Sequence, residues 1–370
     1  MMDMPRPKES SRREFLKGKS AAQALADVAQ RASQADAPAE LPAALSSRAT
    51  FLTQVTRRAM ACDFSVFLNA SQHQAAEESA LAALDLIDGL EDQLTVFRDD
   101  SEVSRLNVAA ADRPVVVERG LFCLLQLAVE LYEKTGGAFD VTAGPLSKLW
   151  GFHRREERLP IEQSVGEVLQ RVGSRWLKLD ASAHSVSFLR PGLQINFGAI
   201  GKGYALDRCA EVLQQAGVDD FLIHGGQSSV LARGRRAGEP SGWRVAVRHP
   251  LRPETRLGEL TLSGAALATS GSSRQHFIHH GRRYGHILDP RTGQPAQGVV
   301  SATVVASTAA VADALATAFF VMGPQQTREF CEREPGVAAV LVVPGDREGS
   351  VRVELCGPAA DVWHDEGGPA

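Results

Sequence analysis

The stretch FLIHGGQSSVLARG, residues 221–234, indicates how this chain folds. It contains two short runs of β-forming residues, Phe221–His224 and Val230–Arg233, joined by a glycine-containing turn. Strands that follow one another through so short a connection pair in antiparallel fashion. The stretch therefore predicts neighbouring antiparallel strands.

The same pattern continues on both sides of this stretch. Further strands are expected at Trp176–Asp180, Ser185–Leu189, Leu193–Phe197, Trp243–Arg248, Leu257–Leu262, Phe277–His279, Tyr284–Leu288, Val299–Ala306, Ala338–Val343 and Val351–Leu355. Apolar residues at helical spacing predict helices at Gln74–Leu94, Leu121–Lys134, Gly203–Ala216 and Ala309–Met322. Because strands outnumber helices and mostly follow one another, we expect an α+β fold of mixed, largely antiparallel sheets with packed helices.

The two ends of the chain differ in composition from the expected packed domain, residues 53–356. Residues 1–52 are rich in Ala, Ser, Gln and charge and predict a tail and linker, and residues 357–370 predict a flexible tail. SSRREFLK, Ser10–Lys17, is similar to a twin-arginine export signal, although little beyond Ala follows as an apolar stretch. We expect the periplasm or cell envelope if this segment works, and the cytoplasm otherwise.

Charge and cysteine content exclude several classes of protein. The 370 residues include 44 acidic and 40 basic ones, a net charge of −4, so bulk charge gives no reason to expect a nucleic-acid partner. The sequence contains no run of about 18 apolar residues, so we expect no transmembrane helix. The 5 cysteines form no CxxC pair and no zinc pattern, and we expect them to be structural.

TGGAFDVTAGPLSKLWGFH, Thr135–His153, is the first segment with unusual chemistry. Two glycines stop the preceding helix, and Asp140 is expected in a tight turn that exposes its carboxylate. The alternative interpretation is that Asp140 caps the turn.

INFGAIGKGYALDR, Ile195–Arg208, predicts a strand that runs through glycines into a helix. Backbone amides at a helix start suit a phosphate, and Lys202 adds a positive charge. The spacing of the glycines matches neither a Walker A loop nor the GxGxxG motif of dinucleotide-binding proteins. The alternative is simple strand-to-helix packing.

ALATSGSSRQHFIHHGRRYGHILDPRTGQP, Ala266–Pro295, contains three histidines. His280 is expected at a hairpin tip and His279 in solvent, so we do not expect a zinc site. His286 ends a strand before a rigid turn and is the better candidate for chemistry. A turn-bonding or core histidine is the alternative.

VADALATAFFVMG, Val311–Gly323, places Asp313 and Thr317 on one face of a helix among apolar neighbours. Two hard oxygens at this spacing suit Mg²⁺. The alternative is a capped helix start in which Asp313 accepts a backbone amide.

Taken together, these segments resemble the ApbE family of FAD:protein FMN transferases over about residues 55–345. The motifs that carry the resemblance are FRDDSEVSRLN (97–107), TGGAFDVTAGPLSKLWGF (135–152), GAIGKGYALD (198–207), the Gly225-Gly226 pair, ATSG (268–271), HILDPRTGQP (286–295) and the helix of Asp313 and Thr317. The resemblance implies a T-fold-like α+β domain. It also implies a Mg²⁺-dependent enzyme that moves FMN from FAD onto a Thr or Ser hydroxyl of an acceptor protein and releases AMP.

The resemblance also assigns residues to sites. For FAD it implies Met60, Phe97, Ala138, Phe139, Asp140, Lys202 and Leu288, and Asn196 stands where the family usually has Asp. For the metal it implies Asp313, Thr317 and the region of the Ala199 carbonyl. His286 or Asp140 would act as a base or orient the acceptor hydroxyl.

Four short segments depart from the family pattern. Met60-Ala61-Cys62 replaces Met-Gly-Thr, Asn196 replaces Asp, Gly226-Gln227 replaces Gly-Asp, and Ser272-Ser273 replaces Asp-Tyr. These changes bear on FAD affinity and acceptor choice more than on the fold. An FAD pyrophosphatase, a non-catalytic flavin-binding protein and a scaffold without ligand therefore stay open as alternatives.

Overall fold

The computed structural model describes residues 51–70, 75–154, 156, 158–272, 275–347 and 349–365. The export-like segment Ser10–Lys17, Ser273 and residues 366–370 of the expected tail lie outside these residues. Within the described part, no helix has the length and apolar character needed to cross a membrane.

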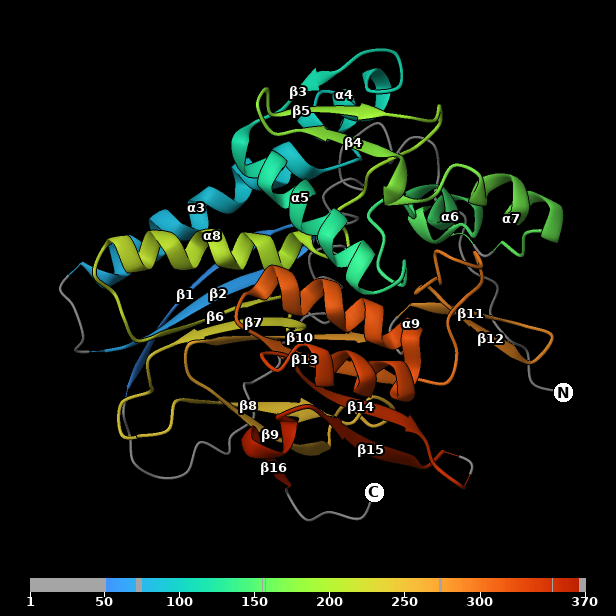
Figure 1. Ribbon diagram of the computed structural model, residues 1–370. Coiled ribbons are helices and arrows are strands. Elements are labelled where there is room, and N and C mark those ends of the chain that lie inside the picture. Colours follow the sequence, from blue (N-terminus) through green and yellow to red (C-terminus); the bar gives the residue numbers. More distant parts are fainter. Residues whose placement is uncertain are drawn as a thin grey trace, which may run out of the picture. The chain divides into compact units, whose positions relative to one another are not determined.

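A large antiparallel sheet forms the centre of the domain (Figure 1). Its eight strands follow the order β1-β2-β6-β7-β10-β13-β14-β15. The bounds are β1 Leu52–Ala59, β2 Cys62–Asn69, β6 Phe221–Gly225, β7 Ser229–Arg233, β10 Ala265–Gly271, β13 Ser301–Ala306, β14 Ala338–Pro344 and β15 Val351–Cys356. Every neighbouring pair is antiparallel, which confirms the expected α+β class.

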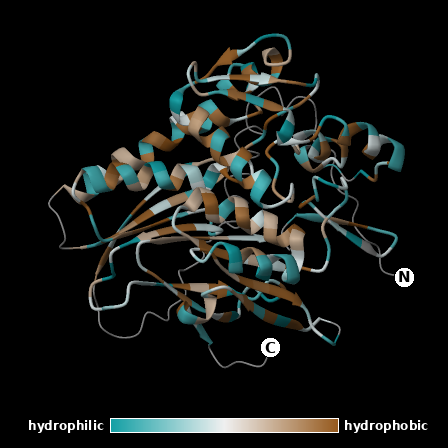
Figure 2. Cartoon of the chain, in the orientation of Figure 1, coloured by the Kyte–Doolittle hydropathy of each residue, from teal (hydrophilic) through white to brown (hydrophobic). Residues whose placement is uncertain are grey.

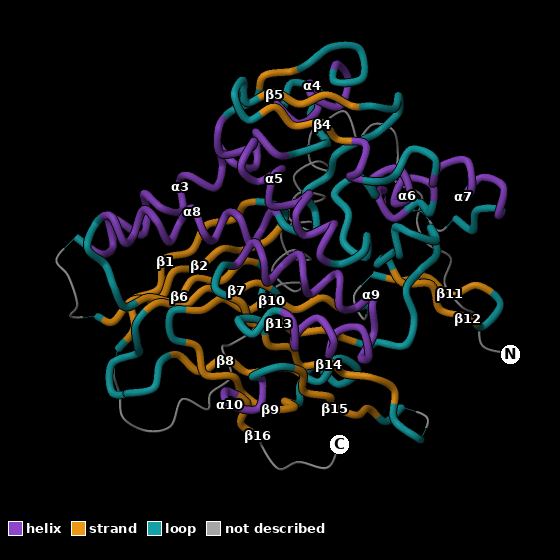
Figure 3. The backbone as a smooth tube through the Cα atoms, viewed as in Figure 1, coloured by secondary structure: helices purple, strands orange, loops and turns teal. Residues whose placement is uncertain are grey.

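Three helices cover one face of this sheet, and a small sheet with a short helix covers the other (Figures 1 and 3). The helices are α3 Ala76–Leu94, α8 Gly201–Gln215 and α9 Ala309–Arg333, and the opposite layer is β8 Trp243–Arg248, β9 Arg256–Leu262, β16 Trp363–Asp365 and α10 Ala359–Val362. Both faces of the sheet are apolar because alternate residues of a strand point to opposite faces. In β14, Ala339 and Leu341 belong to the core beneath the helices, whereas Ala338 and Val340 belong to the core beneath β8 and β9. Hydrophobic residues run along these strands (Figure 2).

Smaller elements lie around this framework. They are α4 Glu102–Ala109, α5 Arg119–Lys134, α6 Gly144–Leu149, α7 Glu162–Leu169, β3 Val115–Val116, β4 Leu177–Asp180, β5 Ser185–Phe188, β11 His276–His279 and β12 Arg282–Gly285, with short 3₁₀ turns at Phe152–Arg154 and Ser174–Trp176. Strands β3, β5 and β4 form one small sheet, and β11 and β12 form a hairpin.

The crossing of α8 and α9 fixes the position of the candidate active site, which is described below. A Cβ on Gly203 would lie 2.1 Å from the carbonyl oxygen of Ala309, so only glycine allows this approach. The Asp207 carboxylate accepts hydrogen bonds from the backbone N–H groups of Ala309 (2.8 Å) and Ala310 (2.9 Å). Burial raises the pKa of Asp207. The first turn of α9 is thereby held against α8.

The prediction of a strand at Leu193–Phe197 is wrong. Both backbone groups of Ile195 bond to the side chain of Asn107, with Ile195 N donating to Oδ1 (2.7 Å) and Nδ2 donating to Ile195 O (2.9 Å). The N–H of Asn196 donates to the carbonyl of Val141 at 2.8 Å. Among the described residues, no strand pairs with this segment. The Asn107 side chain and the Val141 carbonyl instead provide hydrogen bonds for the backbone of Ile195 and Asn196.

Several other boundaries differ from those expected. Strand β12 ends at Gly285 rather than at Leu288, so His286 follows this strand instead of ending it. Helix α9 continues to Arg333 through a break at Gly323, whose φ of 75° and following Pro324 interrupt the helical backbone. The expected tail contains α10 and β16, and β16 pairs with β9 while Trp363 packs over Gly258. The prediction of a flexible tail is therefore wrong for residues 359–365.

Candidate active site

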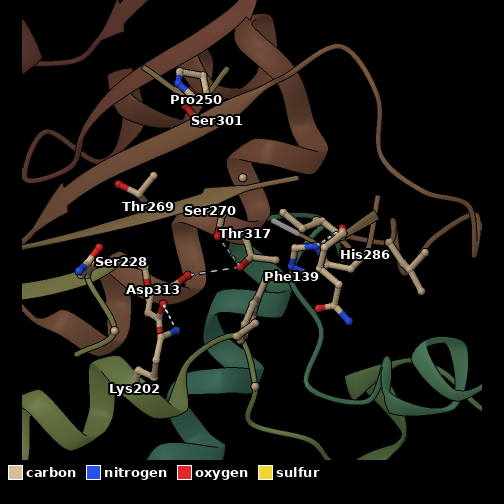
Figure 4. A pocket seen from close by; sticks show the side chains of 18 of the residues that line it. Phe139, Lys202, Ser228, Pro250, Thr269, Ser270, His286, Ser301, Asp313 and Thr317 are labelled. Atoms are coloured by element: carbon tan, nitrogen blue, oxygen red, sulfur yellow. Dashed lines mark hydrogen bonds and ion pairs between the residues drawn. The ribbon is translucent and has the colours of Figure 1, made fainter. Parts of the chain in front are cut away.

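A cavity of about 850 Å³ opens where the α8 and α9 starts meet the ends of the sheet strands. It is lined by the predicted residues Phe97, Ala138, Phe139, Asp140, Asn196, Ala199, Lys202, His286, Leu288, Asp313 and Thr317. Figure 4 shows Lys202, Asp313, Thr317 and His286 arranged around it. Segments far apart in the sequence therefore converge on one site.

Asp313 stands at the meeting point of the two helices. Its Oδ2 accepts a hydrogen bond from Gly203 N at 3.1 Å, and its Oδ1 accepts one from Ser229 Oγ at 3.3 Å. The ammonium of Lys202 lies 3.5 Å from Oδ1, and the Asp313 side chain is only 7% exposed. The amide comes from α8 rather than from the helix that carries Asp313, so Asp313 does more than cap its own helix. A buried carboxylate is thereby compensated by a cation and two donors.

Thr317 lies one turn further along α9. Its hydroxyl is 3.1 Å from Ser270 Oγ of β10, and it also approaches the carbonyl of Asp313 at 3.5 Å. One carboxylate with neighbouring hydroxyls is a hard-oxygen set that suits Mg²⁺, which keeps waters and substrate phosphates as its other ligands. The described residues contain no cluster of three His, Cys, Asp or Glu side chains that could enclose a metal without such ligands. The site fits an open Mg²⁺ site.

His286 lines this cavity, and only one of its ring nitrogens has a hydrogen-bond partner among the described residues. Its Nδ1 lies 3.0 Å from the carbonyl oxygen of Gln275, and because a carbonyl only accepts, Nδ1 carries the proton. In the neutral ring Nε2 then keeps its lone pair. Burial lowers the pKa of His286, and the charge of Lys202 lowers it further, against the opposing bond to Gln275. The arrangement favours a neutral imidazole that can accept a proton.

Asp140 is buried rather than exposed, so the expected exposure of its carboxylate is wrong. Oδ1 accepts hydrogen bonds from Thr142 N (2.8 Å), Thr142 Oγ1 (2.7 Å) and Ser174 Oγ (2.7 Å), and Oδ2 accepts one from Ser174 N (3.2 Å). Burial raises the pKa of Asp140 and these bonds act against that rise. Its oxygens bind the protein's own donors, which favours a role in shaping the cavity wall.

An aromatic pair lies at the edge of the cavity. The ring of Phe97 stacks on that of His153 with a centroid distance of 4.6 Å and an interplanar angle of 14°. Phe97 is 72% exposed, which is unusual for so large an apolar side chain. Such a ring can stack on a planar heterocycle. His153 is the last residue of the segment Thr135–His153 but was not among the predicted site residues.

The glycine loop before α8 is held by side-chain amides. Asn196 Oδ1 accepts the N–H of Gly198 at 2.8 Å, while Asn107 grips the backbone of Ile195. Asn107 is the last residue of the segment FRDDSEVSRLN, so its place in that motif could have identified it as a residue that positions the site. Ser270, the partner of Thr317, likewise lies in the ATSG motif without having been singled out.

Met60 does not line the cavity. It occupies the β1–β2 turn with φ 48°, its N–H donates to Glu91 Oε2 at 2.7 Å, and Ala61 follows with φ 59°. Two successive positive φ values are typical of a turn that favours glycine. Ala61 is therefore strained where the family pattern has Gly. Gln227, another departure, also has a positive φ, 61°, and does line the cavity.

A sequence model of the ApbE family matches residues 60–341. The chain belongs to the ApbE family. It is 32% identical over 312 residues to an FAD:protein FMN transferase of Klebsiella pneumoniae, covering 82% of this chain and 87% of that protein. It is 33% identical over 292 residues to the FAD:protein FMN transferase of Treponema pallidum, covering 75% and 79%.

A solved ApbE structure shares the fold. The apo form of the flavinyl transferase ApbE of Pseudomonas stutzeri superposes with a TM-score of 0.75 at 29% identity, covering 84% of this chain and 96% of that one. The family resemblance expected from the motifs is therefore confirmed, and so is the α+β fold that it implied.

Proposed function

We propose that this protein transfers the FMN half of FAD to a Thr or Ser hydroxyl of an acceptor protein and releases AMP. One observation carries the proposal: a single cavity in an ApbE-family fold holds Lys202, Asp313, Thr317 and a proton-accepting His286. Its volume of about 850 Å³ falls in the range of sites for cofactor-sized ligands.

The transfer exchanges one phosphorus–oxygen bond for another. The acceptor hydroxyl oxygen attacks the phosphorus of the FMN half, the bond from that phosphorus to the bridging oxygen breaks, and AMP leaves with that oxygen. A hydroxyl has a high pKa, so His286 Nε2 takes its proton as the new bond forms. Lys202 neutralises charge on the phosphates.

One Mg²⁺ belongs to this proposal. Asp313 would hold it together with the Thr317 hydroxyl and the Ala199 carbonyl, and Asp313 is already placed by Gly203 and Ser229. When bound, the ion supplies positive charge to the pyrophosphate.

The flavin ring has a candidate platform in the exposed Phe97. Its ring is accessible beside the cavity, and His153 already stacks on one of its faces. A planar isoalloxazine ring would gain offset-stacking contacts of the same kind.

The test combines two products of one reaction. The purified protein is mixed with FAD, Mg²⁺ and a candidate acceptor domain, and AMP is quantified while the intact mass of the acceptor is recorded. Transfer predicts AMP together with an acceptor heavier by one FMN. Free FMN with an unmodified acceptor would instead establish an FAD pyrophosphatase. Bound FAD with no AMP would establish a flavin-binding protein without this chemistry.

A further inference from the structure

The hairpin of β11 and β12, His276–Gly285, lies beside the cavity without lining it. The lining includes Gln275 and His286, the residues on either side of the hairpin, and none of the residues between them. A small molecule held in the cavity therefore leaves the hairpin free. Figure 1 shows the hairpin extending from the domain near α6 and α7.

One face of the hairpin is anchored. Phe277 and Tyr284 stack with ring centroids 5.2 Å apart, and both approach Trp150, at 6.4 Å and 5.8 Å. Phe152 adds a contact to Phe277 at 5.7 Å. These aromatic contacts hold the hairpin in place relative to His286, which directly follows β12.

The opposite face of the hairpin is exposed and lacks acidic residues. Ile278 is 63% exposed and pairs across the strands with Arg283, which is also exposed. The Arg283 guanidinium donates to the carbonyl of Ser272 at 2.6 Å and approaches His276 Nδ1 at 3.3 Å. No Asp or Glu occurs in the sequence between Glu259 and Asp289, although the whole chain has a net charge of −4. We name His276, Ile278 and Arg283 the outer hairpin face.

We propose that the outer hairpin face docks the acceptor protein through an acidic segment next to the hydroxyl that receives FMN. This inference rests on the proposed transfer, because only a macromolecular acceptor must bind outside the cavity while its hydroxyl reaches His286. Carboxylates of such a segment complement Arg283, and an apolar side chain beside them can cover Ile278. Opposite charge would also speed the encounter of enzyme and acceptor.

The test measures binding separately from chemistry. The probe is a fluorescent peptide with one threonine flanked by aspartate, glutamate and leucine, and a matched peptide replaces the acids with their amides. Binding is followed by anisotropy, FAD binding by quenching of flavin fluorescence, and transfer by peptide mass. The variants are Arg283→Glu, which reverses the charge, and Arg283→Gln, which keeps a donor for the Ser272 carbonyl. Lys178→Glu, an exposed charge reversal on β4, is the matched control.

The inference predicts that Arg283→Glu weakens binding of the acidic peptide about tenfold or more and that Arg283→Gln weakens it less. FAD binding and the melting temperature stay as in the unchanged protein, and Lys178→Glu binds the peptide normally. Equal binding of the acidic and amide peptides, or unchanged binding by Arg283→Glu, would overturn the docking site. Binding to vesicles of anionic lipid in place of the peptide would overturn it in favour of a membrane surface. Failure of the proposed function is distinguishable, because the peptide would then gain no mass, whether or not AMP forms and whatever the binding.

Discussion

Replacing Gly203 with Ala tests whether the α8–α9 crossing positions the site. The added Cβ would lie 2.1 Å from the Ala309 carbonyl oxygen and 2.7 Å from Ala310 N, both backbone atoms that cannot rotate away. Because a carbon–oxygen contact needs about 3.3 Å, the helix starts must separate by about 1 Å. Overpacking of this kind costs about 1–3 kcal/mol of unfolding free energy, which lowers Tm by about 1.5–5 °C in a domain of this size.

The same separation of the helices is expected to lower the reaction rate. Gly203 N donates to Asp313 Oδ2, so separating the helices moves Asp313 relative to Lys202. A displacement of about 1 Å in a catalytic group costs about 100-fold in rate. We expect AMP release to fall by about that factor in the Gly203→Ala protein, measured by chromatography at saturating FAD and Mg²⁺, with Tm from scanning fluorimetry.

Gly201→Ala is the matched control. It lies in the same first turn of α8, where a Cβ would meet its nearest atom, Phe197 Cβ, at an ordinary 3.6 Å. We expect its rate and Tm to match those of the unchanged protein or to exceed them slightly. If Gly203→Ala also retained full rate and stability, the crossing would not position Asp313 and the reasoning would be refuted.

Three further predictions concern the metal, the base and the turn. Asp313→Asn should lower Mg²⁺-dependent AMP release about 100-fold, whereas Asp361→Asn, at an exposed position of α10, should leave it unchanged in an Mg²⁺ titration. Because burial lowers the pKa of His286, the rate should rise with pH through a midpoint below about 6.5 and then level off, and His286→Gln should abolish this rise in a pH–rate profile. Ala61→Gly should raise the free energy of unfolding by about 0.5–1 kcal/mol in urea by relieving a positive φ, while Ala82→Gly, at an exposed position of α3, should lower it by about 1 kcal/mol. A loss of stability in the first of these two variants would contradict the turn assignment.

The parts of the site that depend on local spacing could be predicted from the sequence. Asp313 and Thr317 share a helix face because they are four residues apart, and both line the cavity. The glycines after Lys134 end α5 with positive φ, as expected. The resemblance to the family then assigned residues from distant segments to one site, and all of them except Met60 line the cavity.

What the sequence could not predict depends on tertiary partners. The apolar run around Ile195 has the pattern of a strand, but the side chain of Asn107 satisfies its backbone, and no local rule places Asn107 there. The same holds for Ser229 and Ser270, whose strands bring them to Asp313 and Thr317. Asp140 was expected to expose its carboxylate because it was placed in a tight turn, yet Asp140 is buried and Ser174, 34 residues away in sequence, donates to its oxygens.

The most direct measurement asks which oxygen attacks the phosphorus of FAD. The reaction is run in water labelled with heavy oxygen, with FAD, Mg²⁺ and an acceptor domain, and the products are analysed by mass spectrometry. Transfer predicts FMN attached to the acceptor and AMP, neither of which contains the label, because the new bond uses the acceptor's own oxygen. Labelled free FMN beside an unmodified acceptor would show that water attacks instead and would contradict the account.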